Sequence, residues 1–255
     1  MLGLGNTLSN SGRMPTPFYF NNYSLLFDGV DDNVLIPLDL NLALTNDFTL
    51  SVWCYPTSTG GVERMLDRGT SYYLTWGEAG GGGSAKFEFT VYRSGPGPHY
   101  EKLVADSTSS LNQWHHVVGT TSGGGGSGVM SLYVDGAVAA DGVVSLQDAA
   151  VNATNFDIGS YGGGAGGAFE GYIDEVAVWD TALSESAVTS IYNSGSPIDL
   201  TESFGNYPGG RYLIAWWRCG DGTEAGSGST IYDMSGSTGS IDGALSGAAY
   251  STNAP

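Results

Sequence analysis

Residues 48–55 read FTLSVWCY, and the alternation of apolar and polar side chains along this stretch decides the fold class. Successive side chains of a strand point to opposite faces, so a period of two predicts a strand with one buried and one wet face. The same period returns in residues 86–92, KFEFTVY, and in residues 130–135, MSLYVD. We therefore expect antiparallel strands that bury one face in a shared core.

Glycine clusters separate these strands, at residues 80–83, 123–126 and 162–167. Glycine tolerates positive φ and interrupts helices, so the clusters predict loops of a sandwich or barrel. One helix is expected at residues 183–192. There Ser184 can cap the first turn, and Leu183 and Val188 have the spacing of a hydrophobic staple. The fold class is all-β with one short helix.

Charge narrows the possible partners. The chain has 8 Lys plus Arg against 26 Asp plus Glu, a formal net charge of −18, which argues against nucleic acid and anionic membranes. No run approaches the roughly 18 apolar residues of a membrane helix. No apolar signal segment opens the sequence, so we expect synthesis in a cytoplasm without export. Cys54 and Cys219 lie in apolar runs and are expected to be buried free thiols.

Five segments, in this order, carry a resemblance to a known family. They are LLFDGVDDNV at residues 25–34, FTLSVW at 48–53, WHHVVG at 114–119, LYVDG at 132–136 and GYIDEVAVW at 171–179. Together they resemble the laminin-G-like domains of the concanavalin A-like lectin/glucanase superfamily. The resemblance covers residues 23–195 and implies an antiparallel jelly-roll β-sandwich.

The two ends of the chain fall outside that resemblance. Residues 1–22 lack Asp and Glu and are expected to form an N-terminal arm that docks on a neighbour or stays floppy. Residues 196–255 form a C-terminal extension. Its segment LIAWWRCGDG at residues 213–222 resembles strands that usually open this family's domain. We expect residues 211–247 to complete the sandwich of the same chain; completion of a neighbour's sandwich or a separate small module are the alternatives.

A second resemblance rests on the start MLGLGN at residues 1–6, the single laminin-G-like domain, and the tail with WWR at 216–218, GDG at 220–222 and YDMS at 232–235. This combination resembles virion structural proteins of marine tailed phages. That resemblance implies a structural or decoration protein on the exterior of a phage particle, made in the host cytoplasm. Its partners would be other virion proteins of the capsid, neck or tail, further copies of itself and host-surface glycans. The alternatives are a carbohydrate-binding adhesin of a bacterial surface and, third, a glycoside hydrolase.

Catalytic residues are not expected. A glucanase of this superfamily needs two carboxylates on one strand face, usually as Glu-x-Asp-x-x-Glu. The nearest match begins at Glu170, where Gly171-Tyr172-Ile173 intervene before Asp174 and Glu175. Asp174 and Glu175 are adjacent, so they are predicted to face opposite sides of the strand. The sequence therefore favours a non-enzymatic protein.

Two sets of candidate binding residues remain. Calcium prefers carboxylate and carbonyl oxygens, and a calcium site is predicted at Asp28, Asp31 and Asp32 with Asp174 of a neighbouring strand. The alternative is that the three turn aspartates serve only the turn. The candidate glycan-stacking residues are aromatic: Tyr72, Tyr73, Trp76, Tyr92 and Tyr100.

Overall fold

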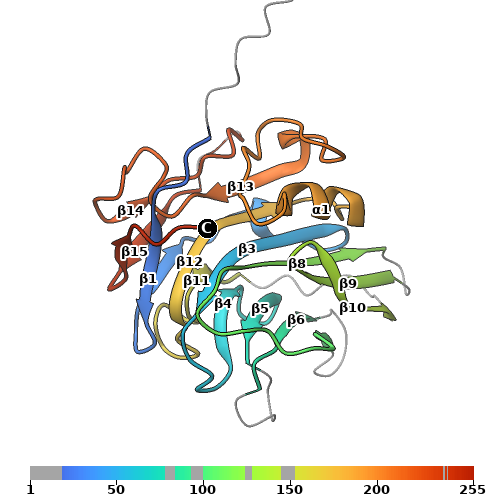
Figure 1. The fold of residues 1–255 in the computed structure, drawn as a ribbon, viewed down its shortest axis with the longest axis horizontal. Helices are drawn as coiled ribbons and strands as arrows, with labels where there is room; N and C mark the ends of the chain where they lie inside the picture. Colours follow the sequence, from blue (N-terminus) through green and yellow to red (C-terminus); the bar gives the residue numbers. More distant parts are fainter. Residues whose placement is uncertain are drawn as a thin grey trace, which may run out of the picture.

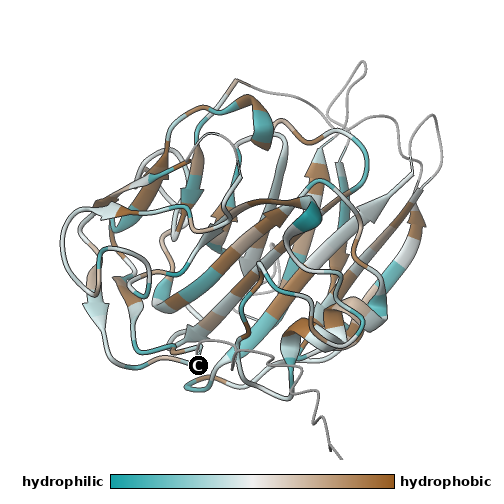
Figure 2. Ribbon diagram, turned by 90° about the horizontal axis from the view of Figure 1, so that it is seen from above, coloured by the Kyte–Doolittle hydropathy of each residue, from teal (hydrophilic) through white to brown (hydrophobic). Residues whose placement is uncertain are grey.

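The computed structural model describes residues 19–77, 84–92, 100–123, 128–144, 153–237, 239 and 241–255. Two antiparallel sheets pack face to face as a β-sandwich, and the predicted fold class is confirmed (Figure 1). Figure 2 shows apolar and polar residues alternating along the strands, the pattern from which the strands were predicted. No helix in the described part of the chain is long and apolar enough to cross a membrane.

Sheet A contains eight strands. In spatial order they are β10 (Ala137–Val144), β9 (Gly128–Val134), β8 (His115–Ser122), β3 (Phe48–Pro56), β12 (Glu170–Trp179), β1 (Ser24–Asp28) and β16 (Ala249–Ser251), and β13 (Leu213–Trp217) also pairs with β12. The β9–β10 hairpin turns at Asp135 and Gly136, both at positive φ, as an Asp-Gly turn predicts.

Sheet B also contains eight strands. In spatial order they are β14 (Thr230–Ile231), β15 (Gly243–Ser246), β2 (Asn33–Ile36), β11 (Phe156–Ile158), β4 (Glu63–Asp67), β5 (Tyr72–Trp76), β6 (Phe87–Tyr92) and β7 (Tyr100–Val104). Two short 3-10 helices, η1 (Leu40–Leu42) and η2 (Gly210–Tyr212), lie in the connections.

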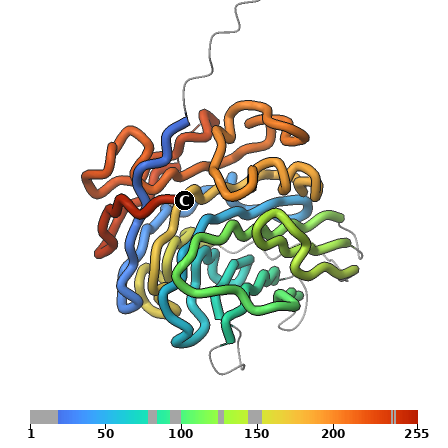
Figure 3. The backbone as a smooth tube through the Cα atoms, viewed as in Figure 1, coloured from blue at the N-terminus to red at the C-terminus, as the bar shows by residue number. Residues whose placement is uncertain are grey.

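The C-terminal residues supply strands to both sheets. β13 and β16 pair with β12 and β1 of sheet A, and β15 pairs with β2 of sheet B. Trp217 of β13 enters the core, where its ring lies 5.5 Å from that of Phe156 and its Nε1 donates to the Ile241 carbonyl at 2.7 Å. Strands β13, β15 and β16 therefore extend the sheets that contain β12, β2 and β1. Figure 3 shows the blue segment at residues 19–28 running beside the orange and red C-terminal segments.

Helix α1 (Glu185–Tyr192) and the segment after it cover part of the outer face of sheet A. The helix begins two residues later than predicted, and Ser184 caps it by accepting from the Ala187 amide at 3.3 Å. Beneath the helix and the segment that follows it lie Trp179 and Trp216, both buried. Both cysteines are buried and free, as predicted.

Candidate functional site

A cavity of about 530 Å³ lies on the outer face of sheet B. Its lining comes from β2, β4 and β11, from the loops after β4 and β11, and from the residues just before β11: Leu35, Asp67, Gly69, Ala153, Thr154, Asn155, Asp157, Tyr161, Gly162 and Gly163. Side chains at these strand positions point away from the core because their strand neighbours, such as Phe156 and Ile158, fill it. We call this site the sheet-B cavity.

Two buried carboxylates form its floor. Asp67 of β4 and Asp157 of β11 are direct cross-strand partners. Asp67 accepts the Gly69 amide at 2.6 Å and lies 3.4 Å from Arg64 Nε. Burial raises the pKa of Asp67 to about 6, against the opposing effect of Arg64. The floor of the cavity therefore presents two carboxylates as hydrogen-bond acceptors, and neighbouring groups fix that of Asp67 in place.

The glycine loop after β11 is built around Asp157. Its carboxylate accepts the amides of Gly162 at 3.1 Å and Gly163 at 3.2 Å, while burial raises its pKa. The Tyr161 amide donates to the Gly166 carbonyl at 3.0 Å, and the Tyr161 side chain is 44% exposed at the cavity wall. The loop thus fixes an accessible aromatic ring beside two carboxylates.

Sequence reasoning missed Asp67, Asp157 and Tyr161. The available signal was a single aspartate between two apolar residues, Phe156 and Ile158, which places Asp157 on the face opposite the core. The pairing of Asp157 with Asp67 could not be found this way, because it depends on the register between strands far apart in sequence.

Three of the five predicted aromatic residues form a row on the same outer face. The ring centroids of Tyr73 and Tyr92 are 6.0 Å apart, and those of Tyr92 and Tyr100 are 5.6 Å apart. Tyr73 is the cross-strand partner of Asp67, so the row starts beside the cavity. Arg64 covers the Tyr73 ring at 3.4 Å, and exposure increases along the row until Tyr100 is 52% exposed. We call these residues the tyrosine row.

The other two aromatic candidates, Tyr72 and Trp76, were predicted wrongly. Both are fully buried. They alternate with Tyr73 along β5 and therefore point into the core, where Tyr72 donates to the Leu42 carbonyl and Trp76 to that of Ser58. Neither ring is available to a glycan.

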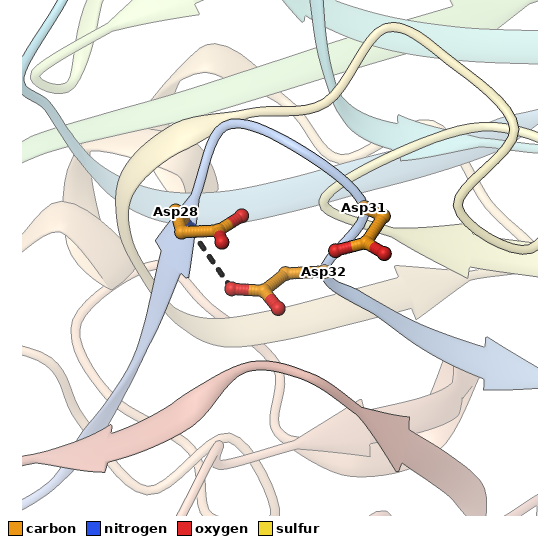
Figure 4. Close-up of side chains that lie close together, drawn as sticks. All are labelled: Asp28, Asp31 and Asp32. Atoms are coloured by element: carbon orange, nitrogen blue, oxygen red, sulfur yellow. Dashed lines mark hydrogen bonds between the residues drawn. The ribbon is translucent and has the colours of Figure 1, made fainter.

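The predicted metal ligands separate into two places. Asp28, Asp31 and Asp32 lie together in the turn between β1 and β2, each with a carboxylate oxygen within 4.8 Å of the others (Figure 4). Asp32 also accepts the Asp28 amide at 2.8 Å, so it serves the turn itself. Asp174 is not in this cluster, because the antiparallel register places Glu170 opposite Asp28 and Asp174 four residues further along β12.

Asp174 and Glu175 instead hold the segment before β1. A bulge in β12, where Glu175 has φ +48°, turns both side chains to the outer face, so the prediction that they face opposite sides is wrong. Asn21 donates to Asp174 at 2.9 Å, and the hydroxyl of Tyr19 donates to Glu175. Burial, and next the neighbouring Glu175, raise the pKa of Asp174 well above its ordinary value.

Aromatic and cationic side chains from β13 and the residues after it complete this buried cluster. Glu175 accepts the indole of Trp216 at 2.6 Å and lies 3.3 Å from Arg218 Nε. The Arg218 guanidinium lies 4.3 Å from the Tyr19 ring centroid. Asp221 accepts the backbone amides of Asn22 and Tyr23, each at 2.7 Å. Nearly every polar group of this cluster joins residues 19–23 to β12 or to the residues after β13.

Comparison with known proteins identifies a family and several similar folds. Residues 28–189 match the model of the concanavalin A-like lectin/glucanases superfamily. No curated protein matches the sequence. One similar structure is that of a Bacteroides ovatus protein to which carbohydrate binding has been assigned provisionally. It gives a TM-score of 0.67 at 20% identity over 91% of this chain. The chain spans 60% of the length of that protein.

Two further solved structures share the fold. The heptameric SAP-like pentraxin of Limulus polyphemus gives a TM-score of 0.53 at 14% identity, over 88% of this chain and 95% of the pentraxin. Domain 4 of AbnA, a GH43 extracellular arabinanase of Geobacillus stearothermophilus in complex with arabinotriose, gives 0.50 at 19% identity, over 66% of this chain and 76% of that domain. At these identities the likeness shows a shared fold and nothing more.

Proposed function

Because this chain belongs to the concanavalin A-like lectin/glucanases superfamily, we propose that it is a non-catalytic protein that binds glycans at the outer face of sheet B. The observation that carries the proposal is the junction of the sheet-B cavity with the tyrosine row. Binding sites for small ligands are concave and combine apolar surface with a few fixed polar groups. The cavity supplies the polar groups, and Tyr161 and Tyr100 supply exposed rings.

The chemistry of the lining suits a sugar. Ring faces of tyrosine pack against the C–H faces of a pyranose or furanose, while carboxylates accept hydrogen bonds from its hydroxyls. Asp67 and Asp157 are held in place by loop amides, so they meet a ligand without first being ordered. Such preorganisation favours binding.

Binding is a better fit than hydrolysis. Both carboxylates already hold neighbouring structure: Asp157 accepts two loop amides, and Asp67 accepts the Gly69 amide beside Arg64. A glycosidase needs one carboxylic acid to give up its proton and the second to attack or activate water. Turnover of a β-glucan by the purified protein would contradict a non-catalytic role.

A glycan array followed by titration calorimetry tests the proposal. We expect Tyr161→Ala to weaken binding at least about tenfold, because it removes the exposed ring at the cavity wall. The matched control is Tyr212→Ala, which removes a ring that is 37% exposed and lies outside the sheet-B cavity. An array without any bound glycan, or equal losses in both variants, would contradict glycan binding at this site.

For the biological setting we propose a structural or decoration protein on the exterior of a phage particle, present in several copies. The acidic composition and the resemblance of the chain ends to virion proteins support this role. The same glycan site would serve an adhesin of a bacterial surface. The two settings differ in where the protein is found: in purified particles or on cells.

A truncation tests attachment to the particle. Removing residues 1–18 leaves Tyr19 and Asn21 in contact with the buried carboxylates of β12, so the sandwich should stay folded. We expect the shortened protein to be lost from particles while keeping the circular dichroism of the full chain. Unchanged incorporation would contradict attachment through residues 1–18.

A further inference from the structure

We infer that the sheet-B cavity selects uncharged glycans and rejects glycans that carry carboxylate or sulfate groups. The inference rests on the proposed function and adds the charge class of the ligand. It follows from the carboxylates in the cavity lining and from the positions of the neighbouring cations, which lie beside carboxylates.

The fixed charge of the cavity is negative. Asp67 and Asp157, side by side on β4 and β11, supply two carboxylates to its lining. An anionic sugar group would enter against these charges in a partly desolvated site, where repulsion is stronger than in water.

The cations that the structure describes on this face lie beside buried carboxylates. Among the residues that the structure describes on the outer face of sheet B, Arg64 lies 3.4 Å from Asp67 and over the Tyr73 ring, and Lys102 lies 3.0 Å from Glu88. An anionic ligand that drew either cation away would leave a buried carboxylate, Asp67 or Glu88, without its partner. Losing such a partner leaves a charge buried and unpaired, which is costly.

An uncharged glycan meets groups suited to hydroxyls. Carboxylate oxygens accept hydrogen bonds and donate none, whereas a sugar hydroxyl donates readily. The Thr154 hydroxyl in the cavity lining is buried without a hydrogen-bond partner in the described part of the chain. Asn155, exposed in the same lining, offers amide donors as well. The lining can therefore exchange several hydrogen bonds with neutral hydroxyls.

The experiment compares matched glycans that differ in one charge. Each neutral oligosaccharide that binds the array is titrated beside its uronic-acid counterpart and its singly sulfated counterpart, by calorimetry at low salt and about pH 8, where Asp67 is ionised. We expect the neutral glycan to bind at least about tenfold more tightly than either anionic form. Equal or tighter binding of an anionic form would overturn the inference and leave glycan binding intact.

Two further comparisons locate the discrimination. Asp67→Asn removes one carboxylate of the floor and should reduce the preference for neutral glycans, whereas Asp141→Asn makes the same change on exposed β10 of sheet A and should not. The second comparison uses the unmodified protein at about pH 5, below the pKa of Asp67. Protonation of Asp67 at that pH should also reduce the preference for neutral over anionic glycans.

Three groups surround the Asp67 carboxylate and bear on its titration. Charged neighbours of Asp67 are Arg64 on β4 and Asp157 on β11, and Tyr73 stands opposite on β5. A preference that stays constant in both comparisons would contradict control by these carboxylates. Absence of binding by every neutral and anionic glycan would contradict the proposed function, and this inference with it.

Discussion

At the residue scale, Arg218 neutralises the most deeply buried acidic cluster of the described structure. Its guanidinium faces Glu175, whose side chain is 2% exposed and lies beside Asp174. We expect Arg218→Ala to lower the free energy of unfolding by about 3–5 kcal/mol, because it leaves a buried carboxylate without its cation. Chemical denaturation followed by tryptophan fluorescence measures this loss.

Arg211→Ala is the matched control for that substitution. Arg211 is exposed and lies over the Tyr212 ring at 5.0 Å, so its removal should change the free energy of unfolding by no more than about 0.5 kcal/mol. Equal losses in the two variants would show that Arg218 does not compensate the buried acids.

The burial of His116 predicts how the stability of the fold depends on pH. His116 is buried on the outer face of sheet A, 2.8 Å from the Ser51 hydroxyl and stacked on Trp53, and burial lowers its pKa from 6.5 to about 3. Below about pH 6.5 the unfolded chain therefore binds a proton that the folded chain refuses. The stability contributed by neutral His116 is present above that pH and is lost as pH falls toward 3.

A variant that cannot titrate isolates this effect. The stability of the wild type minus that of His116→Gln should decrease between pH 7 and pH 5, by up to about 1.4 kcal/mol for each pH unit below 6.5. Carboxyl groups with raised pKa act in the opposite direction, but they are common to both proteins and cancel in the difference. Urea midpoints at the two pH values measure it; a constant difference would contradict a depressed pKa.

At the element scale, local patterns predicted those strands whose alternation is regular. The period of two in residues 48–55 located β3, and Asp135-Gly136 located the β9–β10 turn, because both depend on neighbours in sequence. The β12 bulge at Asp174 and Glu175 escaped, since the buried partners that stabilise it come from both ends of the chain. The pairing of Asp67 with Asp157 escaped as well, because it depends on the register between β4 and β11.

The pairing of the C-terminal strands with β12, β1 and β2 predicts that the rest of the chain does not fold without them. Deleting residues 210–255 removes β13 from β12, β16 from β1 and β15 from β2, and takes Trp217 out of the core. Removing one such tryptophan already costs about 3–5 kcal/mol, comparable to the stability of many domains. We expect the fragment 1–209 to lack near-ultraviolet circular dichroism, and the separate fragment 210–255 to restore it. Cooperative unfolding of 1–209 alone would contradict this expectation.

At the scale of the whole molecule, the net charge of −18 opposes compaction. Salt screens such repulsion, since the Debye length falls from about 30 Å at 0.01 M to about 8 Å at 0.15 M. The same excess of acid would extend the proposed preference for uncharged glycans beyond the cavity, because it would repel an anionic polymer before the polymer reached sheet B. Cations that bind specifically should then stabilise the fold more than screening alone does.

The acidic turn between β1 and β2 is where we expect such a cation to act. Asp28, Asp31 and Asp32 offer hard oxygen ligands within 4.8 Å of one another, the chemistry that calcium prefers. Calcium should raise the melting temperature above that in NaCl of equal ionic strength, because a cation bound only by the folded state stabilises it by mass action. Asp31→Asn should abolish this additional rise, whereas Asp141→Asn, an exposed change of equal charge on β10, should preserve it. Equal calcium responses in both variants would mean that the three aspartates serve the turn and general screening, and bind no ion.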